Sequence, residues 1–434
     1  MLFERKADSM KIKIIKKSYS DVISSSPAKR FVPKKPDVFF RSLLKLVSLP
    51  DLMVTHFKYD KIDMDKLGKR EPCLFLMNHS SFIDLEIAAS ILYPRPFNIV
   101  ATTDSFVGKA WLMRQIGCIP TKKFVSDIGL VRDMKYTIEK LHSSVVMYPE
   151  ASYSFDGTNT VLPESLGGCI KLLGVPVVMI RTYGAFTRDP LYNGLQRRKV
   201  RVSAEMKYLL SPEQIKESSP EELNEILKRE FTIDNFAWQK ENEVRIKEVF
   251  RADYLHRALY KCPHCKTEGE MLGKGITLKC YECGAEYEMD ELGSLKATNV
   301  ETAFSHVPDW YAWQRACVRE EIERGEYKLE TPVRILMGVD TKHIYDVGEG
   351  VLTHSAEGFH LVGCDGELDY TQKVQASYSL YSDFNWYEVG DVICIGNSKA
   401  LYYCLPQSPD VSVAKVRIAA EELYKLNKNS KKGS

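Results

Sequence analysis

Residues 74–84 read Leu-Phe-Leu-Met-Asn-His-Ser-Ser-Phe-Ile-Asp, an apolar run that leads into an HxxxxD pattern formed by His79 and Asp84. The uncharged run 74–77 predicts a strand, and the stretch 85–92 that follows predicts a helix. Ligands of α/β folds bind beyond the carboxyl ends of the strands. This order of segments therefore predicts an imidazole at the mouth of an α/β sheet.

The types of residue in this pattern suit proton transfer. A histidine accepts a proton near neutral pH, and a carboxylate that holds one ring nitrogen fixes the tautomer. Five residues of a continuous helix advance about 500°, so contact is easier if His79 lies in the turn and Asp84 in the first helical turn. The spacing alone is weak evidence, because His360 and Asp365 repeat it in a strand-like stretch without a following helix. We interpret that second copy as accidental.

Polar residues also stand beside three other apolar runs. These are 117–123, which ends in Lys122 and Lys123, 144–150, which ends in Glu150, and 174–180, which carries no charge and is typical of a buried strand. A base, a carboxylate and a pair of cations that arrive from separate strand ends predict a site for a phosphorylated substrate with a hydroxyl group.

The four segments follow the motif order of the glycerolipid acyltransferase family, which the chain resembles over roughly residues 37–210. His79 and Asp84 match its HxxxxD motif, and 117–123 match its glycine-turn motif. Residues 148–154 match a Phe-Pro-Glu-Gly-Thr-Arg-Ser block, and 175–180 match a Val-Pro-Val/Ile-Val-Pro strand. The resemblance implies an α/β domain over 37–211, with a mixed sheet flanked by helices.

The chain departs from two of the family's motifs. Ala151-Ser152-Tyr153 replaces Gly-Thr-Arg, so the arginine thought to bind the acceptor phosphate is absent, and Met179 replaces a proline. Either another cation supplies the charge, or the acceptor is not a simple lysophosphatidate. Arginine binds phosphate through two bonds where lysine acts as a point charge, so the replacement is not neutral.

The resemblance implies an O-acyltransferase of phospholipid synthesis. It transfers a fatty acyl group from a thioester, acyl-CoA or acyl carrier protein, to a lysophospholipid hydroxyl, first of all that of 1-acylglycerol-3-phosphate. His79 is then the general base, Asp84 orients it, and N–H groups at the helix start stabilise the oxyanion. The residues implied in acceptor binding are Glu150, Lys122, Lys123, Ser152 and Arg181. A catalytically idle lipid-binding scaffold, which recruits partners through its C-terminal parts, stays open as the alternative.

Four cysteines form the strongest metal signature. Cys262-Pro-His-Cys265 and Cys280-Tyr-Glu-Cys283 are two CxxC pairs 14 residues apart. Four thiolates at such spacing can share one tetrahedral ion and close its coordination, which predicts a structural Zn²⁺ in a zinc ribbon over 261–300. Iron is the alternative metal and His264 the alternative ligand. The ribbon holds more Asp and Glu than Lys, which argues against nucleic-acid binding.

Charge and hydropathy point to a lipid surface. Residues 1–36 hold ten Lys or Arg against three Asp or Glu, while the whole chain carries only +2. Such a basic N-terminal arm suits anionic lipid or nucleic acid, or is a solvated tail. Residues 39–49 predict an amphipathic helix, with Arg41, Lys45 and Ser48 on its polar stripe, which either lies in a lipid interface or docks on the core.

We expect a peripheral protein on the inner, cytoplasmic face of the cell membrane. No run approaches 18 apolar residues, so no helix should span a bilayer. The eleven cysteines are odd in number, and no signal-peptide pattern precedes them, which favours a reducing compartment.

The rest of the chain divides into segments with different predicted secondary structure. We expect a helical stalk over 212–260, with 246–260 as a helix that leads into the first CxxC pair, and a helical connector over 301–330. Residues 331–424 predict seven short strands and a final helix, in a small barrel of the pleckstrin-homology type. Two of those strands are expected at 375–381 and 386–389. The tail 425–434 is expected to be disordered.

Overall fold

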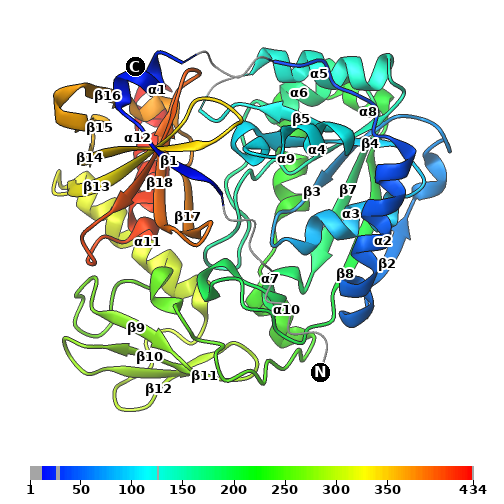
Figure 1. The fold of residues 1–434 in the computed structure, drawn as a ribbon. Coiled ribbons are helices and arrows are strands. Elements are labelled where there is room, and N and C mark those ends of the chain that lie inside the picture. Colours follow the sequence, from blue (N-terminus) through cyan, green and yellow to red (C-terminus); the bar gives the residue numbers. More distant parts are fainter. Residues whose placement is uncertain (1–11, 26–29, 125–126, 433–434) are drawn as a thin grey trace, which may run out of the picture.

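The computed structural model describes residues 12–25, 30–124 and 127–432. In Figure 1 an α/β domain lies on the right, a β-rich domain on the upper left and a small four-stranded sheet below it. Among the described residues, no helix is both long and apolar enough to cross a membrane.

The α/β domain is built on a seven-stranded sheet with the order β2-β8-β7-β3-β6-β4-β5. β8 runs antiparallel to β7 and the other neighbours are parallel, so the sheet is mixed. Its strands are β2 (Lys58–Ile62), β3 (Leu74–Met77), β4 (Phe97–Thr102), β5 (Cys118–Thr121), β6 (Ser144–Met147), β7 (Val177–Tyr183) and β8 (Ser203–Leu210). Its helices are α2 (Val38–Val54), α3 (Ile83–Leu92), α4 (Ala110–Gln115), α5 (Ile128–Glu139), α6 (Leu166–Leu173), α7 (Ala185–Arg188), α8 (Pro212–Glu217), α9 (Pro220–Phe231) and α10 (Asn235–Glu241).

The central strand β3 explains why its sequence carries no charge. It pairs with β7 on one side and β6 on the other, and all four of its residues are buried. Phe75 and Met77 join the core under α2 and α3, whereas Leu74 and Leu76 join the core under α5, α6 and α9. Both faces are covered, as is usual for parallel strands. His79 follows directly at the carboxyl end of this strand.

Residues 212–260 do not form the predicted helical stalk. α8 and α9 begin at Ser211 and Ser219 with capping boxes, and α9 buries Leu223 in the core of the α/β domain. The helix expected over 246–260 is wrong, because only Leu255–Arg257 form one 3-10 turn. The backbone of this stretch bonds instead to the small sheet, with Tyr254 N donating to the Gly273 carbonyl at 3.0 Å.

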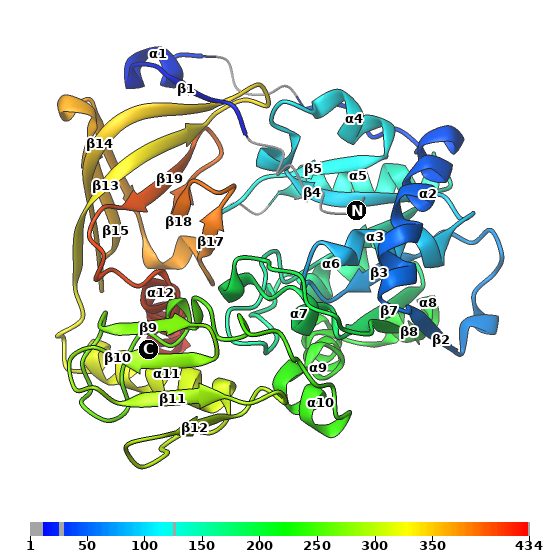
Figure 2. The same ribbon diagram turned by 60° about the horizontal axis from the view of Figure 1, so that its bottom comes forward.

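The small sheet holds the four cysteines and is antiparallel. Its order is β12-β11-β10-β9, with β9 (Met271–Lys274), β10 (Thr277–Cys280), β11 (Glu286–Met289) and β12 (Leu295–Ala297). The expected helical connector is α11 (Val307–Glu323), and Figure 2 shows the sheet beside it. Trp310 of α11 packs on Tyr287 of β11, with ring centroids 4.9 Å apart, so sheet and helix share one core.

The β-rich domain consists of seven antiparallel strands and a terminal helix. The strand order is β16-β15-β14-β13-β19-β18-β17. The strands are β13 (Leu329–Gly338), β14 (Ile344–Ser355), β15 (Gly358–Gly363), β16 (Leu368–Gln372), β17 (Tyr381–Trp386), β18 (Gly390–Gly396) and β19 (Leu401–Pro406), and α12 (Val413–Lys432) follows. A β-rich C-terminal domain is therefore present, and its assignment to the pleckstrin-homology type stays a prediction.

Three details of this domain differ from the sequence expectations. The strand expected over 375–381 is wrong, since Val374–Ala376 form a 3-10 turn and β17 begins only at Tyr381. The strand expected over 386–389 is wrong beyond its first residue: Trp386 ends β17, and residues 387–389 form a turn in which Tyr387 and Glu388 have positive φ. α12 continues to Lys432, so 425–432 are helical rather than a disordered tail.

The described parts of the predicted basic arm lie against the protein. β1 (Ile14–Lys16) pairs in parallel with β14, at the edge of the β-rich domain (Figure 2), and a short helix α1 (Tyr19–Ile23) follows. Arg30 forms ion pairs with Asp127 at 3.0 Å and Asp133 at 2.8 Å. Residues 1–11 and 26–29 of the arm lie outside the described residues.

Candidate active site and metal site

His79 and Asp84 are brought together by the turn between β3 and α3. His79 lies in the turn and Asp84 in the first turn of α3, so the five-residue spacing does not run along one helix. Nδ1 of His79 lies 3.2 Å from Oδ2 of Asp84. The same oxygen accepts the N–H groups of Ser80 at 2.7 Å and Ser81 at 3.0 Å. This arrangement fixes the ring with its proton on Nδ1 and leaves Nε2 as the basic nitrogen.

The exposure of the two side chains fits a base and its orienting group. The imidazole of His79 is 26% exposed, whereas the carboxylate of Asp84 is completely buried. Thr182 of β7 adds a hydroxyl that donates to Asp84 Oδ1 at 3.4 Å. A carboxylate held by such donors can orient the imidazole through one ring nitrogen.

The amides at the start of α3 have partners within the protein. Ser80 and Ser81 donate to Asp84, and the N–H of His79 donates to Glu150 Oε2 at 2.9 Å. These three amides, in the turn before α3, are therefore not free to bind an oxyanion, and for the other N–H groups at the helix start the expectation stays a prediction.

The second HxxxxD pattern does not form a pair. His360 lies on β15 and its Nε2 is 2.8 Å from Asp369 of the neighbouring strand β16. Asp365 lies in the turn after β15. Without a helix start to fold the five residues back, the same spacing leaves the two side chains apart.

Glu150 forms a hydrogen bond to the turn that carries His79. It lies just beyond β6 and is buried, with Oε2 accepting from His79 N and Oε1 accepting from Thr160 N at 2.7 Å. Burial raises the pKa of Glu150 to about 7, against the two backbone hydrogen bonds, which lower it. Both carboxylate oxygens are thus committed to backbone groups beside the imidazole.

Two tyrosines enclose His79 and were not singled out from the sequence. The rings of Tyr148 and Tyr153 lie 4.5 Å and 4.4 Å from the imidazole, centroid to centroid. Burial raises the pKa of both phenols well above 10. Tyr153 occupies the position of the missing motif arginine, and that departure is the signal that could have pointed to it.

The three candidate cations have other partners. The ammonium of Lys123 lies 2.7 Å from Asp104, which also accepts the Tyr403 hydroxyl of the β-rich domain at 3.0 Å. Burial opposes the charge on Lys123, but the ion pair outweighs it and the pKa of Lys123 is raised. Lys122 donates to the Ser398 carbonyl at 3.2 Å, and Arg181 donates to the Glu230 carbonyl on α9.

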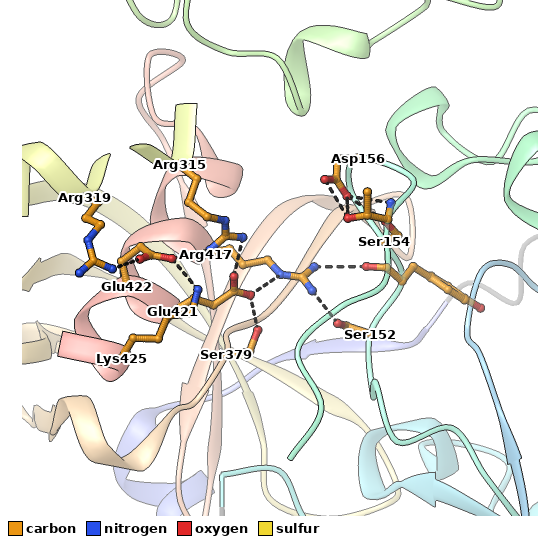
Figure 3. A network of polar contacts seen from close by, with 12 residues as sticks. Ser152, Ser154, Asp156, Arg315, Arg319, Ser379, Arg417, Glu421, Glu422 and Lys425 are labelled. Atoms are coloured by element: carbon orange, nitrogen blue, oxygen red, sulfur yellow. Dashed lines mark hydrogen bonds and ion pairs between the residues drawn. The ribbon is translucent and has the colours of Figure 1, made fainter. Parts of the chain in front are cut away.

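Ser152 also has a protein partner. Its hydroxyl accepts a hydrogen bond from Arg417 of α12 at 3.0 Å (Figure 3). Of the residues that the sequence singled out, the structure thus brings His79, Asp84 and Glu150 into direct contact. Lys122, Lys123 and Arg181 bond elsewhere, and Ser152 bonds both to Arg417 and, at 3.5 Å, to the Glu150 carbonyl.

The four cysteine sulfurs converge between the small sheet and its preceding loop. All lie within 4.8 Å of one another, with Cys262 and Cys283 3.8 Å apart and Cys265 and Cys280 3.7 Å apart. A tetrahedral ion about 2.3 Å from each sulfur requires separations of about 3.8 Å. The cluster therefore fits a closed four-thiolate metal site, and His264 is exposed and lies outside it.

Comparisons with known proteins agree on the nature of the α/β domain. Residues 58–181 match the family model described as Acyltransferase. The chain is 26% identical over 133 residues to a chloroplastic 1-acyl-sn-glycerol-3-phosphate acyltransferase of Brassica napus. The matched segment covers 30% of this chain and 38% of that protein. The match thus spans well under half the length of this curated relative.

A solved structure, the 1-acyl-sn-glycerophosphate acyltransferase of Thermotoga maritima, is similar at 17% identity and a TM-score of 0.34. The likeness covers 44% of this chain and 76% of that chain, and at this score it adds nothing to the strand pairing described above. The family model and the curated relative support the glycerolipid acyltransferase family for residues 58–181, which lie within the α/β domain.

Proposed function

We propose that the protein transfers a fatty acyl group from a thioester donor to the hydroxyl of a lysophospholipid, with His79 as general base. The observation that carries the proposal is the 3.2 Å contact between His79 Nδ1 and the buried Asp84. The family of the α/β domain supports the type of reaction. The donor is acyl-CoA or an acyl carrier protein.

The proposed reaction needs no covalent enzyme intermediate. Nε2 of His79 takes the proton of the acceptor hydroxyl while its oxygen bonds to the thioester carbonyl carbon. The tetrahedral adduct collapses, the C–S bond breaks and the thiolate leaves, receiving the proton from His79. Asp84 stabilises the transient imidazolium, and a positioned base of this kind contributes about 10²–10⁴-fold to the rate.

The printed name of the Brassica relative supports 1-acylglycerol-3-phosphate as the first acceptor to test. Against it, the motif arginine is absent and Lys123 and Arg181 already have carboxylate or carbonyl partners. Those observations favour the alternative, an idle lipid-binding scaffold that recruits partners through its cysteine cluster and β-rich domain. If the protein is an enzyme for a different acceptor, that acceptor is a lysolipid with another headgroup.

Helix α2 supports attachment to a lipid surface. Although Leu52 is buried, the helix exposes Leu46, Val47, Met53 and Val54 by 63–76%. The predicted polar stripe does not face solvent: Ser48 is buried, Arg41 donates to the Pro94 carbonyl at 2.8 Å, and the Lys45 ammonium lies 4.4 Å from the centre of the Tyr93 ring. The exposed face of α2 is therefore the apolar one, and such a face suits a lipid interface. The protein would then meet its lipid substrate as a peripheral membrane protein, and its location on the inner face of the cell membrane stays a prediction.

For the cysteine cluster we propose Zn²⁺ in a structural role within a zinc ribbon. Thiolate ligands and tetrahedral spacing suit this ion, and a site closed by four thiolates has no position for substrate. The four ligands are Cys262, Cys265, Cys280 and Cys283.

The function is tested with radiolabelled acyl-CoA and acyl carrier protein against a panel of lysolipids that differ in headgroup. We expect transfer to at least one lysolipid, and a loss of about 10²-fold or more in His79→Ala. Circular dichroism of the variant should match the wild type. Transfer by His79→Ala at the wild-type rate contradicts the mechanism, and lysolipid binding without transfer by the wild type supports the idle scaffold.

A further inference from the structure

The β-rich domain reaches the loop that follows Glu150 through one buried arginine. Arg417 of α12 is 4% exposed. Its Nη2 donates to the Ser152 hydroxyl at 3.0 Å and its Nη1 to the Tyr153 carbonyl at 3.2 Å (Figure 3). A single side chain, some 265 residues away along the chain, thus bonds two consecutive residues of that loop.

Phe155, in the same loop, is held from two sides by the β-rich domain. The guanidinium carbon of Arg417 lies 4.5 Å from the centre of its ring. Phe384 of β17 stacks on it with centroids 4.0 Å apart and an interplanar angle of 25°. Both phenylalanines are buried, so the loop is packed as well as hydrogen-bonded.

The loop needs such contacts because its first residue is strained. Ala151 has a φ of +55°, where the family motif has glycine. A left-handed conformation costs a residue with a Cβ about 1–2 kcal/mol, and it persists only where the surroundings hold it. Tyr153, two residues later, is the ring that lies 4.4 Å from His79.

The bonds of Arg417 argue against a direct role in binding the acceptor phosphate. Its Nε donates to Glu421 at 3.3 Å, and Glu421 also pairs with Arg315 of α11 at 2.7 Å. All three guanidinium nitrogens therefore have partners inside the protein, and the charge is compensated by a buried carboxylate. This is the arrangement of a side chain that fixes other groups.

We propose that Arg417 is a positioning residue for the active site: it holds residues 152–155 so that the Tyr153 ring stays packed against the His79 imidazole. The β-rich domain is then part of the catalytic unit rather than an appendage. The structural half of this inference, that Arg417 holds Tyr153 against His79, is independent of the proposed function. The kinetic half, that this contact raises kcat, rests on the proposed acyl transfer.

The structural half is tested by the reactivity of His79 toward diethyl pyrocarbonate, followed by peptide mass spectrometry on the full chain. Arg417→Ala should speed modification of His79, because Tyr153 no longer covers the ring, and Tyr153→Ala should do the same. The matched control is Arg319→Ala, which loses bonds to Glu323 and Glu422 on α11 and α12 but none to the loop. A wild-type rate in Arg417→Ala overturns the proposal.

The kinetic half is tested in the acyl-transfer assay. We expect Arg417→Ala to lower kcat about 10- to 100-fold with little change in acceptor KM, since small misplacements of catalytic groups act on the chemical step. Arg417→Lys, which keeps the charge beside Glu421, should recover part of the loss, and Arg319→Ala should match the wild type. A rise in acceptor KM alone would make Arg417 a binding residue and overturn positioning.

A second variant and the reactivity of His79 cover the cases in which Arg417→Ala does not fold or the wild type is inactive. If Arg417→Ala does not fold, Ser152→Ala removes the bond from Arg417, together with a 3.5 Å bond to the Glu150 carbonyl, and keeps the ion pairs of Arg315 and Arg417 with Glu421. It should change His79 reactivity in the same direction. If the wild type transfers no acyl group, the proposed function fails. The diethyl pyrocarbonate comparison then still decides whether Arg417 positions the loop.

Discussion

The Oδ2 atom of Asp84 accepts two hydrogen bonds from the turn that precedes it. The N–H groups of Ser80 and Ser81 fold back on Oδ2, and this brings the carboxylate to His79 across five residues. The bonds are local, so the contact could be predicted from the order of strand, turn and helix. The roles of Tyr148 and Tyr153 could not, because their distance from His79 depends on how β6 and its loop pack against β3.

The buried carboxyl of Glu150 makes the free energy of unfolding depend on pH. The unfolded carboxyl ionises near 4.5 and the folded one only near 7, because burial raises its pKa. Between pH 4.5 and 7 the carboxyl is ionised in the unfolded state but still protonated in the folded state. Ionisation therefore stabilises the unfolded state, and the free energy of unfolding falls as pH rises, by up to roughly 3 kcal/mol.

We therefore expect the free energy of unfolding of the wild type, relative to Glu150→Gln, to decrease between pH 4.5 and 7. Urea unfolding at pH 5 and pH 7.5 measures it for both proteins. Parallel pH profiles, or a wild-type profile that rises relative to the variant, would show that the pKa of Glu150 is not raised.

Lys123 yields a second residue-scale prediction. Its ion pair with Asp104 is almost wholly buried, with side-chain exposures of 12% and 8%. Lys123→Met leaves a buried carboxylate unpaired and should cost about 3–5 kcal/mol of unfolding free energy. Adding Asp104→Asn should restore part of it, and exposed Lys122→Met should change stability by less than about 0.5 kcal/mol. Unchanged stability with weakened acceptor affinity would instead restore Lys123 as a phosphate ligand.

At the scale of elements, α2 combines a docked face with an exposed apolar one. Leu46 and Val47 are 63% and 64% exposed. We expect Leu46→Glu and Val47→Glu to weaken flotation with anionic liposomes, since each change removes apolar contact and adds repulsion. Val249→Glu is the control, because Val249 is 73% exposed outside this helix. Equal flotation of all three variants would exclude α2 as the membrane contact.

The elements with a regular apolar pattern were predictable, and those set by distant contacts were not. The run 74–77 could be assigned as a strand because both its faces are buried. The stretch 246–260 has apolar residues at helical spacing, yet it is irregular because its backbone bonds to β9. The turn 387–389 could not be foreseen either, since positive φ at Tyr387 and Glu388 is not favoured by these residue types.

At the scale of the whole molecule, contacts between distant segments join the α/β and β-rich domains. β1 joins β14, Tyr403 bonds to Asp104, and Arg417 bonds to the loop after Glu150. Such pairings depend on packing across hundreds of residues, so a single sequence gives no signal for them. For this reason the sequence predicted a series of separate C-terminal segments, whereas in the structure the β-rich domain contacts the α/β domain directly.

The segment that carries the cysteine cluster also contacts the β-rich domain. Lys415 of α12 lies 2.7 Å from Glu268, beside the first CxxC pair, and 2.8 Å from Glu321 of α11. We expect the purified protein to hold one zinc ion, measured by mass spectrometry. Cys280→Ser should lose it and show faster amide hydrogen exchange over 261–300, because metal binding supplies folding free energy. Cys317→Ser is the control, and a metal-free wild type with freely titratable thiols would refute the site.

The central claim, that Asp84 acts through His79 on the acceptor proton, is tested most directly by a double-mutant cycle on kcat. Asp84→Asn should slow acyl transfer by about 10²-fold or more in the wild type, yet cause no further loss in the His79→Ala background, because groups that act as a unit are not additive. An equal loss from Asp84→Asn in both backgrounds, or no loss from either single change, would contradict the account.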